Sequence, residues 1–130
     1  DGDGDLDLII MTTGNKPRLL RNDQQTGHHW VRFHLVSEGT SEKDRSAASP
    51  RDALGALIQI TTATGTQNCM VMPTRSYLAQ TELPVTFGMG KNEQIELVTI
   101  NWPSGKSTSL KNLKPDQLYR ISEQAGLVEK

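Results

Sequence analysis

Four aspartates at alternate positions near the start of the sequence form the group best suited to chemistry. They are Asp1, Asp3, Asp5 and Asp7, with Gly4 inside the run. Calcium takes about six to eight oxygen ligands, and a calcium loop supplies side chains at alternate positions, a glycine for the sharp turn and a main-chain carbonyl just after it. Asp1 and Asp3 would bind through side chains and Asp5 through its carbonyl, and Asp7 would close the site. We predict calcium binding here.

The first ligand of such a loop is absent, so we expect the site to be incomplete in this chain and to need one more carboxylate upstream. The alternative is an acidic turn screened by water, although four carboxylates this close repel one another unless a cation lies between them. The chain opens inside this turn, without a Met start or a leader-like segment. We therefore expect it to be the C-terminal piece of a longer protein.

Catalytic patterns are weak elsewhere in the chain. Cys69 is the single cysteine, which excludes an internal disulfide and a cysteine-based zinc site. His28, His29 and His34 form no obvious metal pair, and we expect them at the surface or at a sheet edge. No Gly-x-Ser-x-Gly elbow is present, so a hydrolase fragment remains only the second alternative. We predict that the protein is not an enzyme.

Length and composition exclude further classes of function. A chain of 130 residues fits one main compact domain, and 35% hydrophobic with 22% charged residues is a globular composition. No block of Lys or Arg alternates with aromatic residues, which argues against a nucleic-acid partner. The longest apolar runs, Leu8–Met11 and Cys69–Met72, are far shorter than the roughly 20 residues that a membrane helix needs. We predict no membrane span.

Short β-rich runs separated by turn residues make up most of the remaining sequence. Residues 30–36 alternate strictly, with Val31, Phe33 and Leu35 on one face, as in a half-buried strand. Similar runs lie at 8–10, 54–63, 67–72, 84–87, 94–102, 107–110 and 118–121. The regular spacing predicts an all-β fold, a β-sandwich or an open β-barrel.

Loops and turns complete this expectation. Ser37–Pro50 has no periodic apolar residues and is predicted to be a long exposed loop, while only Glu123–Lys130 has any helical tendency. Pro103-Ser104-Gly105 is typical of a hairpin turn. We expect Gly55 to allow a close backbone approach, and Gly88 and Gly90 to adopt positive φ.

Aromatic residues decide between two binding roles. Strand positions should bury Phe33, Phe87 and Trp102. The remaining rings, which could form a platform for a glycan, are Tyr77, Tyr119 and Trp30. Tyr77 lies beside Arg75 after a proline and is either a surface residue or a core or corner tyrosine. The candidate ligand surface is Tyr77, Arg75 and Trp30, and two coplanar exposed rings would favour glycan binding.

The start of the sequence resembles the last calcium-loop repeat of the FG-GAP and VCBS families, whose repeats build β-propeller blades. Asn15, Leu19 and the Arg21-Asn22-Asp23 turn continue this likeness. From His29 to about Glu123 the chain resembles the ASPIC/UnbV domain, which follows such repeats in cartilage acidic protein and its bacterial relatives. The residues that carry this resemblance are His29-Trp30, Arg51-Asp52-Ala53-Leu54-Gly55-Ala56, Ser76-Tyr77-Leu78-Ala79-Gln80, Phe87-Gly88-Met89-Gly90, Trp102-Pro103-Ser104-Gly105 and Glu123.

The resemblance implies three segments: residues 1–26 as the end of a calcium-loop repeat and two-stranded remnant of a propeller, residues 27–124 as the ASPIC/UnbV-like β domain, and residues 125–130 as a tail. It implies export to the cell surface, the periplasm or the extracellular space, with upstream propeller repeats of the same protein as the main partner. No catalytic residues are carried over. We expect a binding or structural module of a calcium-dependent adhesion or surface protein, and as the alternative a carbohydrate-binding module. An extracellular protein or glycan is the expected external partner, and exposed edges of the remnant favour a homodimer.

Overall fold

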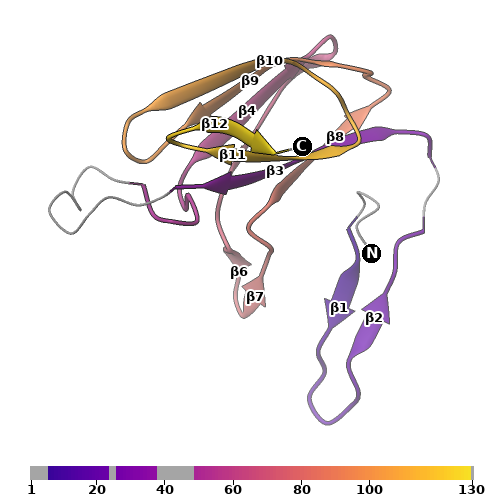
Figure 1. Ribbon diagram of the computed structural model, residues 1–130. Helices are drawn as coiled ribbons and strands as arrows, with labels where there is room; N and C mark the ends of the chain where they lie inside the picture. Colours follow the sequence, from indigo (N-terminus) through magenta and orange to yellow (C-terminus); the bar gives the residue numbers. More distant parts are fainter. Residues whose placement is uncertain (1–5, 24–25, 38–48, 130) are drawn as a thin grey trace, which may run out of the picture.

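The computed structural model describes residues 6–23, 26–37 and 49–129, and these residues form an all-β structure without a helix. Two four-stranded sheets face each other, and two short hairpins project from them (Figure 1). The expected sandwich is confirmed, and no closed barrel forms in the described ranges. The strands are β1 (Leu8–Ile10), β2 (Arg18–Leu20), β3 (His29–Val36), β4 (Leu57–Thr62), β5 (Gly65–Met70), β6 (Thr74–Ser76), β7 (Ala79–Gln80), β8 (Val85–Gly90), β9 (Ile95–Asn101), β10 (Ser107–Leu113), β11 (Gln117–Ser122) and β12 (Gly126–Glu129).

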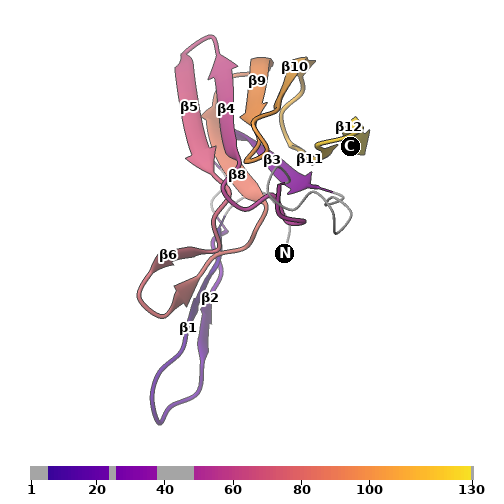
Figure 2. The same ribbon diagram turned by 90° about the vertical axis from the view of Figure 1, so that its left-hand side faces the viewer.

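The two sheets have the strand orders β12-β11-β3-β8 and β10-β9-β4-β5, and Figure 2 shows them from the side. All described pairs are antiparallel except β3 with β11, which run parallel from Val31↔Gln117 to Val36↔Ser122. This parallel pair brings the C-terminal ends of β3 and β11 together. The arrangement places Ser37 and Glu123, which follow those ends, beside each other.

The core lies between the sheets and follows the alternation seen in the sequence. On β3, Val31, Phe33 and Leu35 are buried, while the residues between them are half-buried. The Phe33 ring packs edge-on against Phe87 and stacks on Tyr119, each with ring centroids 6.0 Å apart. The predicted burial of Phe33, Phe87 and Trp102 is confirmed. Such aromatic contacts add directional packing to the hydrophobic burial.

The C-terminal residues depart from the expectation of a tail with a helical tendency. They form β12, which pairs with β11 through Ser122↔Gly126 and Ile121↔Leu127. The Ser122 hydroxyl accepts hydrogen bonds from the main-chain N–H groups of Gln124 and Ala125, and Gly126 has a φ of 74°. These features make a tight turn, and therefore the chain returns as a strand instead of coiling.

The conformations of the turn glycines agree only partly with those predicted from the sequence. Gly90 has the expected positive φ, but Gly88 does not; it pairs with Trp30 beside a register shift between β3 and β8. At Gly55 a Cβ would meet Pro103 at 3.6 Å, an ordinary contact, so the predicted close approach is wrong and its φ of 89° is the reason for glycine there. The predicted turn at residues 103–105 is confirmed, because Gly105 N–H donates to the Trp102 carbonyl at 2.9 Å.

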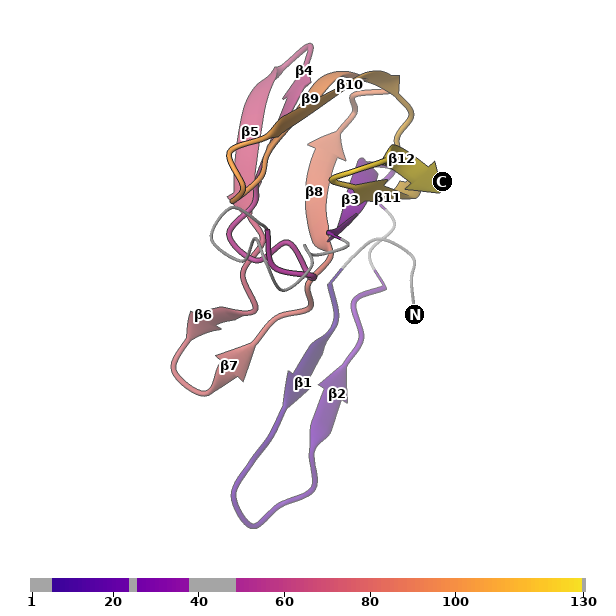
Figure 3. The same cartoon turned by 60° about the vertical axis from the view of Figure 1, so that its left-hand side comes forward.

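The two hairpins, β1–β2 and β6–β7, extend from the same side of the sandwich in Figures 1 and 3. We call them the N-terminal hairpin and the second hairpin. The root of the second hairpin is held where the Thr81 N–H donates to the Pro73 carbonyl at 2.8 Å. Within the described residues each hairpin is a two-stranded sheet. A two-stranded ribbon is marginally stable in water by itself.

Candidate functional site

The predicted calcium ligands are described only at Asp7, since Asp1, Asp3 and Asp5 lie outside the described residues. The Asp7 side chain is exposed, and its Oδ1 accepts a hydrogen bond of 3.0 Å from the Asn22 main-chain N–H. This bond lowers the pKa of the Asp7 carboxyl, so the group is ionised near neutral pH. The charged Asp7 carboxylate therefore connects the start of β1 to the chain that follows β2.

The Asp7 carboxylate fits calcium by its charge. An ionised carboxylate is an oxygen ligand of the kind that binds a hard cation such as calcium. In the described ranges, no three His, Cys, Asp or Glu side chains lie close enough to hold a metal ion. The calcium site accordingly remains a prediction that depends on the aspartates before Leu6.

The N-terminal hairpin exposes nearly all of its apolar side chains. Leu8 is 55% exposed and Ile9 65%, although they lie on opposite faces of β1. The other large apolar residues of this segment are also exposed, namely Leu6, Ile10, Met11, Leu19 and Leu20. Both faces of the ribbon thus present hydrophobic surface to solvent. Contiguous apolar surface of this kind marks an interaction site.

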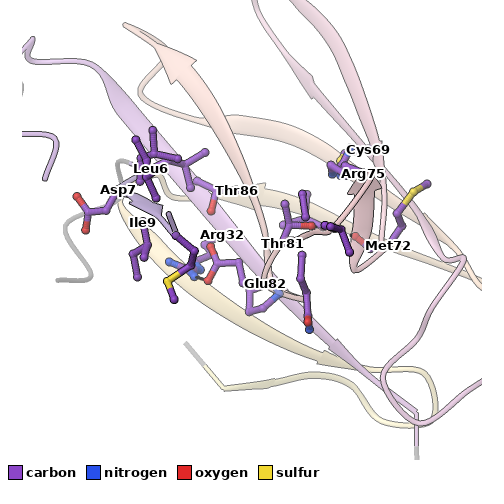
Figure 4. Close-up of a pocket in the computed structure, with 18 residues that line it drawn as sticks. Leu6, Asp7, Ile9, Arg32, Cys69, Met72, Arg75, Thr81, Glu82 and Thr86 are labelled. Atoms are coloured by element: carbon purple, nitrogen blue, oxygen red, sulfur yellow. Dashed lines mark hydrogen bonds and ion pairs between the residues drawn. The ribbon is translucent and has the colours of Figure 1, made fainter. Parts of the chain in front are cut away.

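A cleft separates the two hairpins, and its floor is the edge of the sandwich. We call it the arm cleft, and Figure 4 shows the side chains around it. One wall consists of residues 6–11 and the other of residues 78–82. The remaining lining residues are Arg32, Cys69, Met72, Arg75, Pro84, Val85 and Thr86. The cleft is therefore largely apolar, with a few charged groups.

Two arginines supply charge to the arm cleft. Arg32 on β3 forms an ion pair with Glu82, and the pair crosses the floor. Arg75 on β6 donates to the Cys69 sulfur at 3.0 Å and to the Met70 carbonyl at 3.4 Å. Within the described ranges no carboxylate pairs with Arg75, and its hydrogen bonds go to neutral acceptors. The Thr86 hydroxyl on the floor is buried and has no hydrogen-bond partner there.

The residues predicted as a ligand surface are only partly brought together. Tyr77 is 89% exposed at the turn of the second hairpin, two residues from Arg75. Trp30 is half-buried in β3 and does not line the arm cleft. Tyr119, the third candidate ring, is buried. Since only Tyr77 among the six aromatic side chains is fully exposed, two exposed coplanar rings do not occur.

A buried carboxylate forms a second polar cluster at one end of the sandwich. Glu123 follows β11, and its two oxygens accept hydrogen bonds from the hydroxyls of Ser37, at 2.8 Å, and Ser104. The Ser104 main-chain N–H donates to the Ser49 hydroxyl at 3.2 Å. Because β3 and β11 belong to one sheet and the turn at Ser104 to the other, this serine cluster joins the two sheets.

The surroundings of Glu123 stabilise its negative charge, although the side chain is buried. Burial alone would raise the pKa of its carboxyl, but the hydroxyls of Ser104, Ser37 and Ser49, assisted by the Lys106 charge, lower it below the usual value. Sequence reasoning missed this cluster, because Ser37 and Ser49 bound the stretch predicted as an exposed loop, yet both are buried. Residues 38–48 between them lie outside the described residues. The cluster's contacts give it a structural role.

Of the histidines expected at the surface or at a sheet edge, His28 is exposed, whereas His29 and His34 are half-buried on β3, an inner strand of its sheet. His29 also has a partner. The Nδ1 atom of His29 lies 2.6 Å from Asp116 Oδ2. Asp116 also accepts from the Trp30 N–H at 3.2 Å and donates its own N–H to the Trp30 carbonyl at 2.6 Å. Asp116 thus connects the starts of β3 and β11. The spacing of 87 residues between His29 and Asp116 hides this pair from sequence reasoning.

A comparison with protein families finds one that matches most of the sandwich. The sequence model of one protein family, described as ASPIC and UnbV, matches residues 46–128, more than half of the chain. The match starts after His29 and Trp30 and continues beyond Glu123 to the end of the sandwich. No curated protein matches the chain. The described residues include no helix long and apolar enough to cross a membrane.

Proposed function

The chain belongs to the ASPIC and UnbV family, and we propose that it is a non-catalytic binding and structural module of an exported, calcium-dependent surface or adhesion protein. The family supports the proposed role in a surface protein, because its domain is found in surface and propeller-associated proteins. In this view the sandwich is the rigid body, and the hairpins form the contacts. The proposed location is the cell surface, the periplasm or the extracellular space.

The observation that carries the proposal is the exposed apolar surface of the N-terminal hairpin. Leu6, Ile9 and Met11 are 68%, 65% and 76% exposed, whereas the isoleucines of the sandwich strands, Ile58, Ile60, Ile95, Ile100 and Ile121, are fully buried. A ribbon of two strands with hydrophobic side chains on both faces needs a neighbour to cover it. We propose that the neighbour comes from propeller-type repeats of the same protein, with homodimer formation as a further use of its free edges.

Calcium would act at the start of this hairpin. We propose that Asp1, Asp3, Asp5 and Asp7 hold the ion, with one further carboxylate supplied from upstream. The ion would neutralise the aspartates and fix the turn before β1, which orients the hairpin and the sandwich relative to the repeats. The bond from Asn22 to Asp7 supports this role, because it already ties the same turn to the strand exit after β2.

The test compares this chain with a version extended upstream by one repeat. We expect calcium to raise the melting temperature of the extended protein and to leave this chain almost unchanged, since binding to the folded state alone stabilises it by mass action. An Asp7→Asn variant of the extended protein should lose most of the shift. An Asp52→Asn variant, which changes an exposed aspartate of the sandwich, serves as the matched control. No calcium shift in either form would exclude the calcium part of the proposal.

A further inference from the structure

We propose that the turn of the second hairpin inserts into the surface of an anionic lipid bilayer, with Tyr77 and Leu78 below the headgroups and the nearby cations at the lipid phosphates. The inference goes beyond the proposed function, because it concerns a different segment and a different class of partner. It rests on the proposed location at a cell surface or in the periplasm, but neither calcium nor upstream repeats take part in it.

The turn consists of two side chains that the described protein leaves uncovered. β6 and β7 pair through Ser76↔Ala79, so Tyr77 and Leu78 are the two residues between them. Each is 89% exposed, the highest value among the exposed large hydrophobic residues of the described ranges. In Figures 1 and 3 this turn is the end of the second hairpin farthest from the sandwich. We call these two residues the apex.

The backbone shows that leucine is a costly choice for this turn. Leu78 has a φ of 54°, a left-handed conformation that suits Gly, Asn or Asp and strains a bulky aliphatic residue. The other exposed non-glycine residues with positive φ in the described ranges are Asn112 and Asp116, which tolerate it. Leu78 gains almost no burial within the described chain in return. Strained residues of this kind gather at sites of contact.

The root of the second hairpin holds the apex in a fixed direction. The Thr81 N–H donates to the Pro73 carbonyl at 2.8 Å, and the Thr81 hydroxyl donates to the same carbonyl at 3.3 Å. Arg75 donates to a sulfur and a carbonyl of β5, at 3.0 and 3.4 Å. Arg32 of β3 pairs with Glu82, which follows β7. A rigid projecting turn loses little conformational entropy when it binds.

The charges of the projecting segments match an anionic surface. Residues 70–81 contain no acidic residue, and Arg75 is their one charged residue. The N-terminal hairpin projects from the same side of the sandwich in Figures 1 and 3. Its residues 8–20 add Lys16 and Arg18, both exposed, and again no acidic residue. Basic residues near an anionic bilayer are attracted to it, and the attraction weakens with salt.

Acidic residues lie at the roots of the two hairpins instead. Asp7 precedes β1 and lines the arm cleft. Asp23 follows β2 and pairs with Arg21, and Glu82 follows β7 and pairs with Arg32. The charge therefore changes from mixed near the sandwich to positive toward the ends of the hairpins. Such a polarity turns the ends of the hairpins toward a negative surface.

The spacing of Arg75 and the apex fits the depth of a bilayer surface. Arg75 precedes Tyr77 by two residues, and a strand rises about 3.3 Å per residue, so their main-chain positions differ by roughly 7 Å. Segments that bind at a bilayer surface bury their apolar side about 5–10 Å deep. Arg75 would therefore lie at the phosphates when Tyr77 and Leu78 reach the acyl chains. Tyrosine favours this depth, because its ring is apolar and its hydroxyl polar.

A lipid surface suits the apex better than the upstream repeats do. The chain enters the N-terminal hairpin at its root, where the Asp7 carboxylate accepts from the Asn22 N–H, on the sandwich side of the apex. Tyr77 and Leu78 are equally exposed, so an occupant has to surround both. A fluid bilayer surrounds a projecting turn without a matching shape, whereas a protein needs a concave site for it. The commitment is therefore to lipid.

The first experiment is co-sedimentation of the full chain with vesicles of phosphatidylglycerol and phosphatidylcholine, in chelator. We expect binding that falls with salt and with the share of phosphatidylglycerol. Leu78→Asn keeps a residue that tolerates the left-handed turn and should weaken binding about tenfold or more. Leu118→Asn, at an exposed leucine of the sandwich, is the matched control and should leave binding unchanged. Arg75→Gln should weaken binding to anionic vesicles about fivefold. Circular dichroism of each variant controls for folding.

Insertion is tested with Tyr77→Trp, which places a fluorescent side chain at the apex. Its emission should move to shorter wavelength with vesicles and be quenched by lipids brominated on the acyl chains, after subtraction of the unaltered chain with Trp30 and Trp102. The inference fails if no vesicle is bound, if Leu78→Asn and Leu118→Asn behave alike, or if brominated lipids do not quench.

The chain extended upstream by one repeat separates lipid from protein as the occupant of the apex. We expect the extended protein to bind the same vesicles. If it does not, while the shorter chain does, the upstream part covers the apex and the inference fails. All vesicle measurements are made in chelator, so their failure is distinct from failure of the calcium melting test above.

Discussion

The sandwich and the two hairpins use similar apolar residues in opposite ways. In the sandwich, Val31, Phe33 and Ile58 are fully buried, and edge positions carry the polar residues. In the hairpins, Ile9 and Leu19 are each 65% exposed and Leu78 is 89% exposed. The two regions also differ in strand number, four per sheet against two. The sandwich therefore contains a buried core, whereas the described part of the hairpins leaves most of its apolar surface exposed.

This difference follows from how many neighbours a strand has. Strand β3 has β11 on one side, β8 on the other and a second sheet over its inner face. Each apolar side chain there gains burial worth about 25 cal/mol per Å². Among the described residues, strand β1 pairs with β2 alone, and its leucine and isoleucines are 37–65% exposed, so they gain little. Changes in the two regions should consequently have unequal effects on stability.

The largest expected effect is the loss of an aromatic ring in the core. Phe33→Ala should lower the free energy of unfolding by about 3–5 kcal/mol, because it removes a fully buried ring and leaves a cavity. The ring also contacts Phe87 and Tyr119. Urea unfolding followed by tryptophan fluorescence measures the change. The matched variant, Leu19→Ala in the N-terminal hairpin, should change it by less than about 0.5 kcal/mol. Equal losses would show that the hairpin belongs to the folded core.

A smaller effect is expected at the buried carboxylate between the sheets. Glu123→Gln should cost about 1.5–3 kcal/mol at neutral pH, the worth of hydrogen bonds to a charged group. The pKa of Glu123 is lowered in the folded protein, mainly because three serine hydroxyls outweigh its burial. Its contribution is therefore present above the pKa of the unfolded state and is lost as the pH falls through the folded pKa.

Unfolding free energy measured as a function of pH tests this sign. The wild-type protein should lose stability on the acid side of the usual glutamate pKa, and Glu123→Gln should flatten this part of the curve. Asp7→Asn provides the comparison in the hairpin, since the Asp7 pKa is also lowered, by the Asn22 hydrogen bond, but the group is fully exposed. It should leave the unfolding of the sandwich unchanged. An acid loss that persists in Glu123→Gln would assign it to other carboxylates.

Local patterns in the sequence predicted most of the sandwich. Alternation from Trp30 to Val36 gave β3 and its inner face, because side-chain direction in a strand depends only on position. The turn at residues 103–105 was also predicted from neighbouring residues alone. The parallel pairing of β3 with β11 could not be predicted, since it joins residues 86 positions apart, and nothing in either segment specifies its neighbour.

The candidate site was predicted less well, because its contacts also join residues that are far apart in the sequence. Ser37 and Ser49 were assigned to an exposed loop because serine is polar, but a distant carboxylate, Glu123, changes their environment. The second hairpin escaped notice because its strands have three and two residues, too few for any period. Arg75 and Tyr77 were selected from the sequence, whereas the hairpins that face each other across the arm cleft required the fold.

The smallest expected effect concerns the turn of the second hairpin and has the opposite sign. Leu78→Gly should stabilise the hairpin by up to about 1 kcal/mol, because glycine relieves the left-handed strain that leucine bears there. Tyr77→Gly is the matched change, since Tyr77 is as exposed as Leu78 but has no positive φ. It should destabilise the hairpin by about 0.5–1 kcal/mol.

Hydrogen exchange of the Thr81 amide measures both variants, because its bond to the Pro73 carbonyl closes the root of the second hairpin. Protection should rise up to about fivefold in Leu78→Gly and fall in Tyr77→Gly, as free-energy changes near 1 kcal/mol require. If protection falls in both variants, the Leu78 side chain stabilises its own hairpin by more than the left-handed strain costs.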